Sequence, residues 1–352
     1  MNNYPWTNAI KPLNEQARQA ALDYQNQLTK PPGSLGLLEA LSGQLAAITG
    51  EVKPAFEKKA VIVMAGDHGV CEEGVSAFPA AVTPQMVLNF INGGAAVNVL
   101  ARQAGAKVVC VDVGVNADLE HEQLVNRKVR YGTANMAKGP AMSKEEALAA
   151  IQAGIDTVSE LVEQGCELFA TGEMGIGNTT ASAALLCVFG GVEPEEAVGR
   201  GTGINDEQWK HKCNVVRRAL EVNQPSADDA LDVLAKVGGL EIAGLVGVVL
   251  GAAMHGKPVV IDGFISSAAA LVAVHLAPAV QGYLIGSHLS EENGHRSLLE
   301  VLKVKPVLHL GMRLGEGTGA ALMFQLVDAA CCIMREMATF EQAGVSGKEE
   351  RE

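Results

Sequence analysis

The chain has 352 residues, of which 48% are hydrophobic and only 4% aromatic, and its formal net charge is −13 at pH 7. A chain of this length can bury one large core or divide into two unequal domains. The acidic balance excludes a nucleic-acid-binding protein, because phosphate backbones are bound by basic surfaces. Small anionic ligands stay compatible with it, since backbone amides and one or two cations suffice to hold them.

Short apolar runs rich in β-branched residues recur along the chain, each followed by a glycine or polar turn and then by a helical pattern. They span 60–64, 107–113, 166–170, 258–261, 283–285 and 306–310. Continuous hydrophobicity is typical of strands buried on both faces, and the helices between them favour right-handed βαβ crossovers. The pattern predicts an α/β fold with a Rossmann-like parallel sheet of about six strands flanked by helices.

Helical patterns outside this alternation lie at 13–28, at 35–49 and after residue 320. We expect them to pack as a small helical subdomain formed by both termini, 1–56 and 325–352, beside a large α/β catalytic domain of 57–324. The most membrane-like run, 237–254, contains Glu241 and five glycines. It is predicted to be a tightly packed core helix, so no membrane insertion is expected.

The seven cysteines are scattered, without a C-x-x-C pair or a zinc-like spacing. This usage predicts reduced thiols in a cytoplasmic protein. The N-terminal segment MNNYPWTNAIKPLNEQ lacks a basic stretch followed by an apolar core, so no secretory signal is expected.

Polar residues follow directly after each predicted strand. They are Gly66-Asp67-His68, Gly114, Gly172-Glu173, Asp262-Gly263, Ser287-His288 and residues 313–316. In open parallel sheets, ligands bind outside the carboxyl ends of the strands. We therefore expect these residues to converge on one crevice.

Glu316 stands alone among glycines in GMRLGEGTGA (311–320), between the apolar run 306–310 and a helical pattern. Glycines let the backbone approach a ligand and adopt positive φ. A structural turn would not need the acid, so Glu316 is a candidate proton acceptor that faces a bound small molecule.

A second glycine-rich segment, TGEMGIGNTT (171–180), again presents one acid, Glu173. Asn178 or Thr179 can cap a helix through 181–186, and free amides at that helix start would suit a phosphate. A purely structural glycine turn with a capping Asn is the alternative interpretation.

Two further segments are candidates for binding an anion. In GRGTGI (199–204), alternate glycines favour amides wrapped around an anion, with Lys212 or Arg200 as charge partner; a flexible surface loop is the alternative. In SHLSEE (287–292), Ser290 is the best helix N-cap candidate, and capping alone is the alternative there.

Two rival motifs carry less weight. In GDHGV (66–70) an Asp-His pair could orient a proton shuttle, but no further His or Cys stands at metal-ligand spacing, so no metal is expected and Asp67 is predicted to cap the turn. Residues 315–320 match the dinucleotide fingerprint G-x-G-x-x-A. That fingerprint needs a second strand ending in an acid about twenty residues later, whereas here the chain continues as helix.

The assembled motifs resemble the nicotinate-nucleotide:dimethylbenzimidazole phosphoribosyltransferases, which make the lower-ligand nucleotide of cobalamin. The resemblance covers nearly the whole chain. It rests on KPPGSLGLL (30–38), GDHGV (66–70), GEMGIGNTT (172–180), VRRA (216–219), NQP (223–225), KVGG (236–239), DGFISSAAAL (262–271) and RLGEGTGAAL (313–322).

The resemblance implies transfer of the phosphoribosyl group of nicotinate mononucleotide to 5,6-dimethylbenzimidazole, giving α-ribazole 5′-phosphate and nicotinate. It implies that Glu316 is the general base for the benzimidazole N–H, while the other ring nitrogen attacks C1′. Glu173 would be a second acid, near the ribose or in proton transfer. The departing pyridinium is already cationic, so no metal or cofactor is implied.

By similarity, the 5′-phosphate would be held by Gly175, Lys212 and Ser290, with amides near Thr179, Gly201 and Gly203. The aromatic base would face Leu314, Met86 and Phe78. A homodimer is also implied. Two alternatives stay open: an enzyme of this family acting on another purine-like base or a phenolic ring, and a non-catalytic nucleotide-binding protein.

Overall fold

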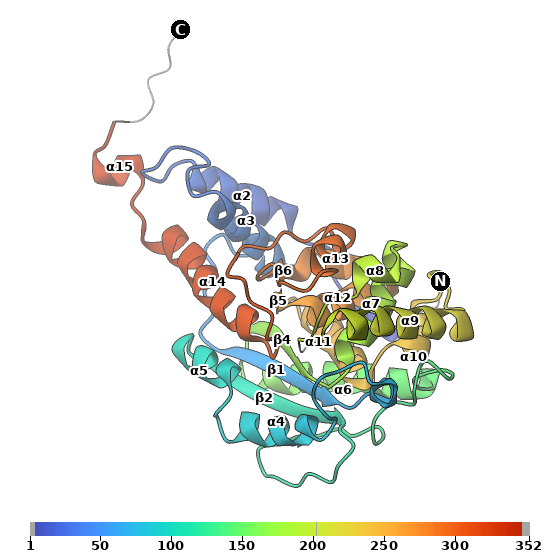
Figure 1. Ribbon diagram of the computed structural model, residues 1–352. Helices are drawn as coiled ribbons and strands as arrows, with labels where there is room; N and C mark the ends of the chain where they lie inside the picture. Colours follow the sequence, from blue (N-terminus) through green and yellow to red (C-terminus); the bar gives the residue numbers. More distant parts are fainter. Residues whose placement is uncertain (1–3, 202, 347–352) are drawn as a thin grey trace.

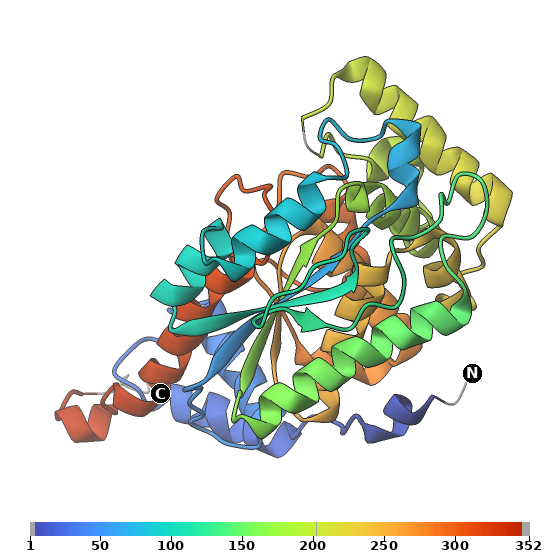
Figure 2. The same ribbon diagram turned by 90° about the horizontal axis from the view of Figure 1, so that it is seen from below.

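The computed structural model describes residues 4–201 and 203–346. At its centre lies a six-stranded sheet in the order β3-β2-β1-β4-β5-β6, with every pair of neighbours parallel (Figures 1 and 2). The strands are β1 (Lys59–Gly66), β2 (Ala106–Gly114), β3 (Val125–Asn126), β4 (Leu168–Met174), β5 (Val259–Ile261) and β6 (Leu284–Gly286). The strand order reverses between β1 and β4, which is where a doubly wound sheet opens its ligand crevice.

Five of the six predicted strands are confirmed, and the run 306–310 is not a strand. It is a loop joined by a single bridge between Leu308 and His288, beyond the end of β6. Leu310 is 56% exposed, so this apolar run lacks the two-sided burial that the prediction assumed. The sixth strand is instead β3, a two-residue edge strand in a largely polar segment without a hydrophobic run.

Helices cover both faces of the sheet. One face is covered by α6 (Lys144–Glu163), α7 (Asn178–Gly190), α10 (Ala230–Val237), α11 (Leu240–Met254) and α12 (Phe264–Leu276), with α9 (Asp206–Asn223) packed on α7 and α10. The other is covered by α3 (Leu37–Thr49), α4 (Val82–Ile91), α5 (Ala96–Gln103) and α14 (Thr318–Glu336). Shorter elements are α1 (Pro5–Ala9), η1 (Gly69–Glu73), α8 (Pro194–Ala197), η2 (Pro278–Tyr283), α13 (His295–Leu302) and α15 (Phe340–Ala343).

Alternate residues of β1 enter two different cores. Ile62 and Met64 belong to the core under α6 and α11, whereas Val61 and Val63 belong to the core under α5 and α14. All four are fully buried, which accounts for the uninterrupted hydrophobicity of the strand.

Helix α11 is the buried core helix predicted for 237–254, and every residue from 240 to 253 is buried. Its glycines allow very close packing on α6. A Cβ added to Gly247 would collide with the carbonyl oxygen of Ile151, and one added to Gly154 would collide with that of Gly244. The glycine content of these helices therefore reflects backbone-to-backbone contact.

Segments near the two ends of the chain pack together. Helix α2 (Glu15–Gln25) lies on α3, and Ala21, Ala46 and Met334 form a small core with α14. Leu28 and Thr339 form an antiparallel bridge, and Figure 1 shows α2 and α3 beside α14. The proposed subdomain boundary at residue 325 falls inside α14, whose first turns pack on the sheet. The division into 1–56 with 325–352 and 57–324 stays a prediction.

Among the described residues, one helix is long and apolar enough to pass a test for a membrane span by length and composition. It is α14, and 56% of its apolar window is buried inside the protein. Burial against a sheet is what a core helix of this composition shows.

Candidate active site

The carboxyl ends of the strands open into a cavity of about 430 Å³. Segments that follow β1, β4, β5 and β6 form its walls, together with α9 and the loop before α14. Ten of the predicted site residues line it: Glu173, Gly175, Thr179, Gly201, Lys212, Ser290, Phe78, Met86, Leu314 and Glu316. Gly203 is exposed and is not among the described lining residues, and position 202 beside it lies outside the described part of the chain. Gly114, at the end of β2, packs against Leu240 instead.

Glu316 is held in an unusual backbone conformation at the start of α14. Its φ is +64°, between Gly315 at +84° and Gly317 at +97°. A non-glycine residue in this region costs on the order of 1–2 kcal/mol. The carboxylate of Asp262 accepts hydrogen bonds from the N–H groups of Gly317 (3.2 Å) and Ala320 (3.0 Å). Asp262 therefore fixes the loop that carries Glu316 at the start of the helix.

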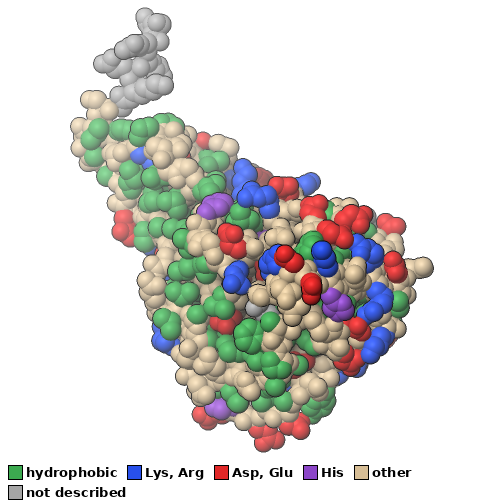
Figure 3. All heavy atoms as spheres, viewed as in Figure 1, with side chains coloured by type: hydrophobic (Ala, Val, Ile, Leu, Met, Phe, Trp, Pro, Cys, Tyr) green, Lys and Arg blue, Asp and Glu red, His purple; other side chains and the backbone are tan. Residues whose placement is uncertain are grey.

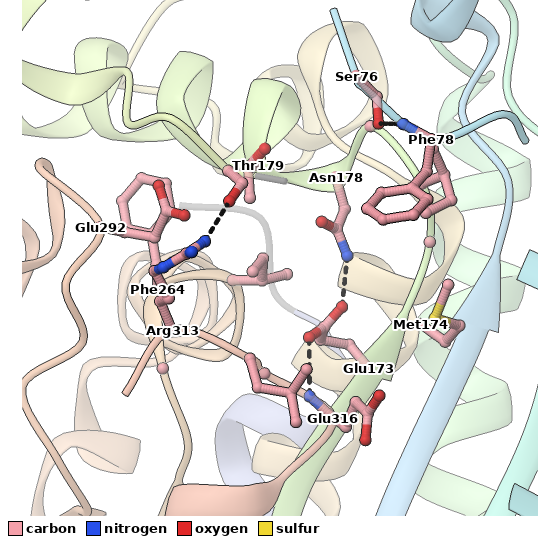
Figure 4. Close-up of a pocket in the computed structure, with 18 of the residues that line it drawn as sticks. Ser76, Phe78, Glu173, Met174, Asn178, Thr179, Phe264, Glu292, Arg313 and Glu316 are labelled. Carbon is pink, nitrogen blue, oxygen red and sulfur yellow. Dashed lines mark hydrogen bonds between the residues drawn. The ribbon is translucent and has the colours of Figure 1, made fainter. Parts of the chain in front are cut away.

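Glu173, at the end of β4, joins this loop to α7. Its Oε1 accepts a hydrogen bond from the backbone N–H of Glu316 at 3.2 Å, and its Oε2 accepts one from the side chain of Asn178 (Figure 4). A Cβ at Gly315 would collide with Glu173, and one at Gly172 would collide with the Glu316 carbonyl. These two glycines are therefore required for the loop to lie against the end of β4.

The predicted capping role of Asn178 is wrong. Helix α7 begins at Asn178 itself, after Gly177 at φ +95°, and shows no side-chain cap. Because the glycine turn ends the strand and starts the helix by itself, the Asn178 amide is turned towards Glu173. Thr179 does not cap the helix either, since its hydroxyl accepts a hydrogen bond from Lys212 Nζ at 2.7 Å.

Burial shifts the proton affinities of both acids. It raises the pKa of Glu173 to about 8, with the negative charges of Asp262 and Glu241 adding to the effect and the N–H of Glu316 partly offsetting it. Burial also raises the pKa of Glu316 to about 7, again with a contribution from Asp262. Glu316 is therefore poised to take up a proton near neutral pH.

One end of the cavity, which we call the anion end, has side chains that could hold an anion. Lys212 reaches it from α9 with a side chain that is almost completely buried, and burial lowers its pKa to about 8. Its ammonium group lies beside Thr179 and the backbone of Gly201. Gly175 and Ser290 also line the cavity.

Ser290 is not the helix N-cap that the sequence predicted. Helix α13 begins at His295 after Gly294, so Ser290 lies in the preceding loop. Its N–H donates to His295 Nδ1 at 2.8 Å. Burial lowers the pKa of His295 to about 3, which keeps this ring neutral and able to accept that bond.

The opposite end of the cavity is apolar. Phe78 is 53% exposed and lies on the same side of the cavity as Met174, while Val82, Met86 and Leu314, which is 57% exposed, add to the apolar lining. Figure 4 shows Phe78 and Met174 across the cavity from Thr179, Arg313 and Glu292. An aromatic ring at one end and an anion at the other would each meet matching chemistry.

Sequence reasoning assigned no role to Glu292 or Arg313, and both line the anion end. Glu292 is buried, and its Oε2 has no hydrogen-bond partner among the described residues. Arg313 Nη1 donates to the Gly201 carbonyl at 3.2 Å. The only available signal was that both stand beside residues of the predicted motifs.

The Asp-His pair after β1 lies behind the glycine loop and does not line the cavity. His68 Nε2 lies 2.6 Å from Glu241 Oε1, with both side chains fully buried. Burial lowers the pKa of His68, but the carboxylates of Glu241, Asp67 and Glu173 together outweigh it and the net pKa is raised. Asp67 accepts the N–H of Asn116 at 2.8 Å, so it fixes the segment after β2 rather than its own turn.

Comparison with known proteins agrees with this architecture. The phosphoribosyltransferase family matches residues 10–345. A nicotinate-nucleotide–dimethylbenzimidazole phosphoribosyltransferase from Chloroflexus aggregans is 57% identical over 344 residues, which cover 97% of this chain and 98% of the relative. The enzyme of that name from Halalkalibacterium halodurans is 54% identical over 339 residues, covering 96% of this chain and 95% of the relative.

A solved structure extends the agreement to the fold. The crystal structure of CobT from Thermus thermophilus matches with a TM-score of 0.91 at 47% identity, covering 95% of this chain and 100% of that chain. Sequence and fold thus agree over nearly the whole chain, which belongs to the phosphoribosyltransferase family of the nicotinate-nucleotide–dimethylbenzimidazole phosphoribosyltransferases.

Proposed function

We propose that the protein transfers the phosphoribosyl group of nicotinate mononucleotide to 5,6-dimethylbenzimidazole in the assembly of the cobalamin nucleotide loop. The observation that carries this proposal is the two-ended cavity with Glu316 in its wall. A buried cation stands at one end, apolar side chains stand at the other, and the pKa of Glu316 is raised to about 7.

The cavity suggests how the two substrates are arranged. The 5′-phosphate is held at the end formed by Lys212, Thr179 and Ser290, where an ammonium group and hydroxyls can meet its oxygens. The benzimidazole lies against Phe78 and Leu314, which offer exposed apolar surface. The ribose then spans the middle of the cavity, next to Glu173. Holding both substrates in line is itself a large part of the catalysis.

The reaction is a displacement at C1′. One ring nitrogen of the benzimidazole attacks C1′, and the bond from C1′ to the pyridinium nitrogen breaks with its electron pair leaving on nicotinate. The attacking ring becomes cationic, which acidifies its other N–H, and Glu316 takes that proton. The product is α-ribazole 5′-phosphate with inverted configuration at C1′. Since the leaving group departs from a pyridinium, it needs no proton from an acid.

Glu316 and Glu173 are proposed to have different roles in the reaction. Glu316 is the base, because its carboxyl group lines the cavity and has an oxygen without a hydrogen-bond partner among the described residues. Glu173 has both oxygens occupied by N–H donors of the protein, so it positions the Glu316 loop and faces the ribose. General-base assistance of this kind is worth about 10²–10⁴-fold in rate.

An acceptor panel tests the proposal. The protein is incubated with nicotinate mononucleotide and either 5,6-dimethylbenzimidazole, unsubstituted benzimidazole, adenine or a phenol, and nicotinate release is followed. Release that is fastest with 5,6-dimethylbenzimidazole is the expected result. Faster release with another base or with the phenol would reassign the acceptor. Nucleotide binding without release under every acceptor would make the protein a non-catalytic binder.

We also propose that the protein is a cytoplasmic homodimer. Leu322, Leu326, Ala329 and Ile333 recur at helical spacing along α14 and are only partly buried. Figure 3 shows hydrophobic side chains gathered over α14 and α5, where Val99 is 53% exposed. A contiguous apolar surface of this kind is typical of a subunit interface.

A further inference from the structure

The anion end of the cavity contains a carboxylate that phosphate binding alone does not explain. Glu292 is 7% exposed, lines the cavity and leaves Oε2 without a hydrogen-bond partner among the described residues. A negative charge beside a bound phosphate is repulsive, and burying a charged oxygen without a partner costs free energy. Its presence therefore needs a compensating benefit.

The feature that benefits is the buried ammonium group of Lys212. Its side chain is 1% exposed, and its one hydrogen bond to a described side chain runs to the neutral hydroxyl of Thr179. The ammonium forms no ion pair with a carboxylate of the described residues, and Glu292 acts on it by charge alone, without a hydrogen bond. A lysine in such surroundings tends to lose its proton, and with the proton it loses its use as a phosphate ligand.

Among the residues that the structure describes, few other ionisable groups act on Lys212. Besides Glu292 these are two thiols, Cys213 on α9 and Cys71 on η1. Burial raises the pKa of both thiols, to about 11 for Cys71, so they are uncharged at neutral pH. Arg313 also lines this end and is cationic, so it opposes protonation of the lysine. Glu292 is thus the group whose negative charge favours the ammonium form.

We propose that Glu292 is the counter-charge that keeps Lys212 protonated in the empty site, so that the ammonium is ready when the nucleotide phosphate arrives. Glu292 acts through Lys212 and is therefore a positioning residue rather than a phosphate ligand. The inference rests on the proposed function, because it takes the 5′-phosphate as the anion bound at this end.

The proposal predicts that Glu292→Gln lowers nucleotide affinity by a factor that depends on pH, and not by the same factor at every pH. With Glu292 present, burial still lowers the pKa of Lys212 to about 8, so removing the carboxylate lowers it further. When binding needs a protonated group, affinity falls about tenfold for each pH unit above the pKa of that group. At lower pH, removal of the carboxylate also relieves repulsion of the phosphate. The effect of Glu292→Gln on nucleotide affinity therefore worsens as pH rises.

The test is calorimetric titration of the full-length protein with nicotinate mononucleotide at pH 6.5 and 8.5. The ratio of dissociation constants, Glu292→Gln over wild type, is expected to rise about sixfold between these pH values, which corresponds to a one-unit fall from the wild-type lysine pKa of about 8. A ratio that changes less than about twofold would overturn the proposal. Glu291→Gln is the matched control, since Glu291 is exposed and carries the same charge one residue away.

Lys212→Arg supplies a second test that does not depend on the fold of Glu292→Gln. Arginine stays charged over this range, so nucleotide affinity in Lys212→Arg should lose its alkaline decline. In that background, adding Glu292→Gln should change affinity by the same factor at both pH values. An alkaline decline that persists in Lys212→Arg would overturn the role assigned to the lysine proton.

Turnover separates this inference from the proposed function. If wild type binds nicotinate mononucleotide but releases no nicotinate with any acceptor, the transferase proposal fails while the titrations still decide the role of Glu292. If transfer proceeds and the affinity ratio does not vary with pH, only the inference fails. If nicotinate mononucleotide does not bind at all, both fail. If the enzyme is active, Glu292→Gln at alkaline pH should raise KM for the nucleotide more than it lowers kcat.

Discussion

The backbone N–H of Glu316 donates to Glu173 Oε1 at 3.2 Å, so one acid of the site holds the main chain of the other. The second oxygen of Glu173 accepts a hydrogen bond from Asn178, whereas Glu316 Oε2 lies buried without a hydrogen-bond partner among the described residues. The two carboxyl groups are therefore not equivalent. Both oxygens of the first are engaged by the protein, whereas the second keeps one oxygen without a donor among the described residues, as its proposed role of base requires.

Replacement of Glu316 by Gln should remove the base and little else. Gln has nearly the same shape and keeps the backbone N–H that bonds to Glu173, so nicotinate mononucleotide should bind with an affinity close to that of wild type. Turnover should fall at least about a hundredfold, the lower end of general-base contributions. Nicotinate release and calorimetric titration measure the two effects. Near-normal turnover by this variant would rule out Glu316 as the base.

The same substitution should stabilise the fold at alkaline pH. The pKa of Glu316 is raised from 4.5 to about 7 in the folded protein, so the folded state binds more protons than the unfolded state between these values. Stability of wild type therefore falls as pH rises through this window. Glu316→Gln carries no charge and escapes this loss, by about 1–3 kcal/mol above pH 8, the lower figure allowing for solvent screening through the open cavity.

Thermal unfolding at pH 5 and pH 8.5 checks this expectation. The melting temperatures of wild type and variant should be close at pH 5 and should separate at pH 8.5, with the variant higher. A variant that melts lower at both values would show that the Glu316 carboxylate is stabilising in the fold.

Strands could be predicted from the sequence where helices bury both of their faces. The run 60–64 is fully buried between two layers of helices, so its continuous hydrophobicity reports its structure directly. The run 306–310 is also mostly apolar but passes outside the end of β6, with Leu310 exposed. Composition alone cannot distinguish these cases, because the difference lies in what packs on the second face.

The site residues that belong to glycine-rich motifs could be predicted from the sequence. The hydrogen bonds and contacts between their side chains could not. Glycine spacing located Glu316 and Glu173, since close backbone approach restricts the residue type there. The side-chain direction of Asn178 depends on Gly177, which precedes α7 in the left-handed region, and no local pattern specifies that. Glu292 comes to face the site only through the packing of the β6 loop on the segment before α9.

Phe78→Ala should weaken binding of the aromatic acceptor without weakening binding of the nucleotide. Phe78 is more than half exposed in the cavity, so its ring is available for stacking and is not needed for the core. An aromatic pair is worth about 0.5–1.5 kcal/mol beyond its buried area, which corresponds to roughly a two- to tenfold rise in KM for 5,6-dimethylbenzimidazole. Initial rates with each substrate varied in turn measure this. Equal rises in both KM values would contradict the assignment of this end to the acceptor.

Gly247→Ala should destabilise the fold while leaving the chemistry of folded molecules unchanged. A methyl group there would collide with the Ile151 carbonyl across the contact of α11 with α6. Forced overpacking costs about 1–3 kcal/mol, so the melting temperature should fall by several degrees. Gly139→Ala is the control, because a Cβ at Gly139 meets nothing within 4 Å. If Gly247→Ala and Gly139→Ala both melt at the wild-type temperature, the backbones of α11 and α6 are not in contact as described.

Leu326→Glu should convert the proposed homodimer to monomers. Leu326 lies midway along the partly buried apolar stripe of α14, so in a dimer formed by this face the carboxylate would be buried without a partner. Light scattering should give twice the 36.7 kDa chain mass for wild type and the single chain mass for the variant. Val222→Glu is the matched control, since Val222 is 50% exposed on α9 and the change adds the same charge there. If Leu326→Glu and Val222→Glu both keep the wild-type mass, this face of α14 is not the interface; if Val222→Glu alone dissociates the protein, the interface lies on α9.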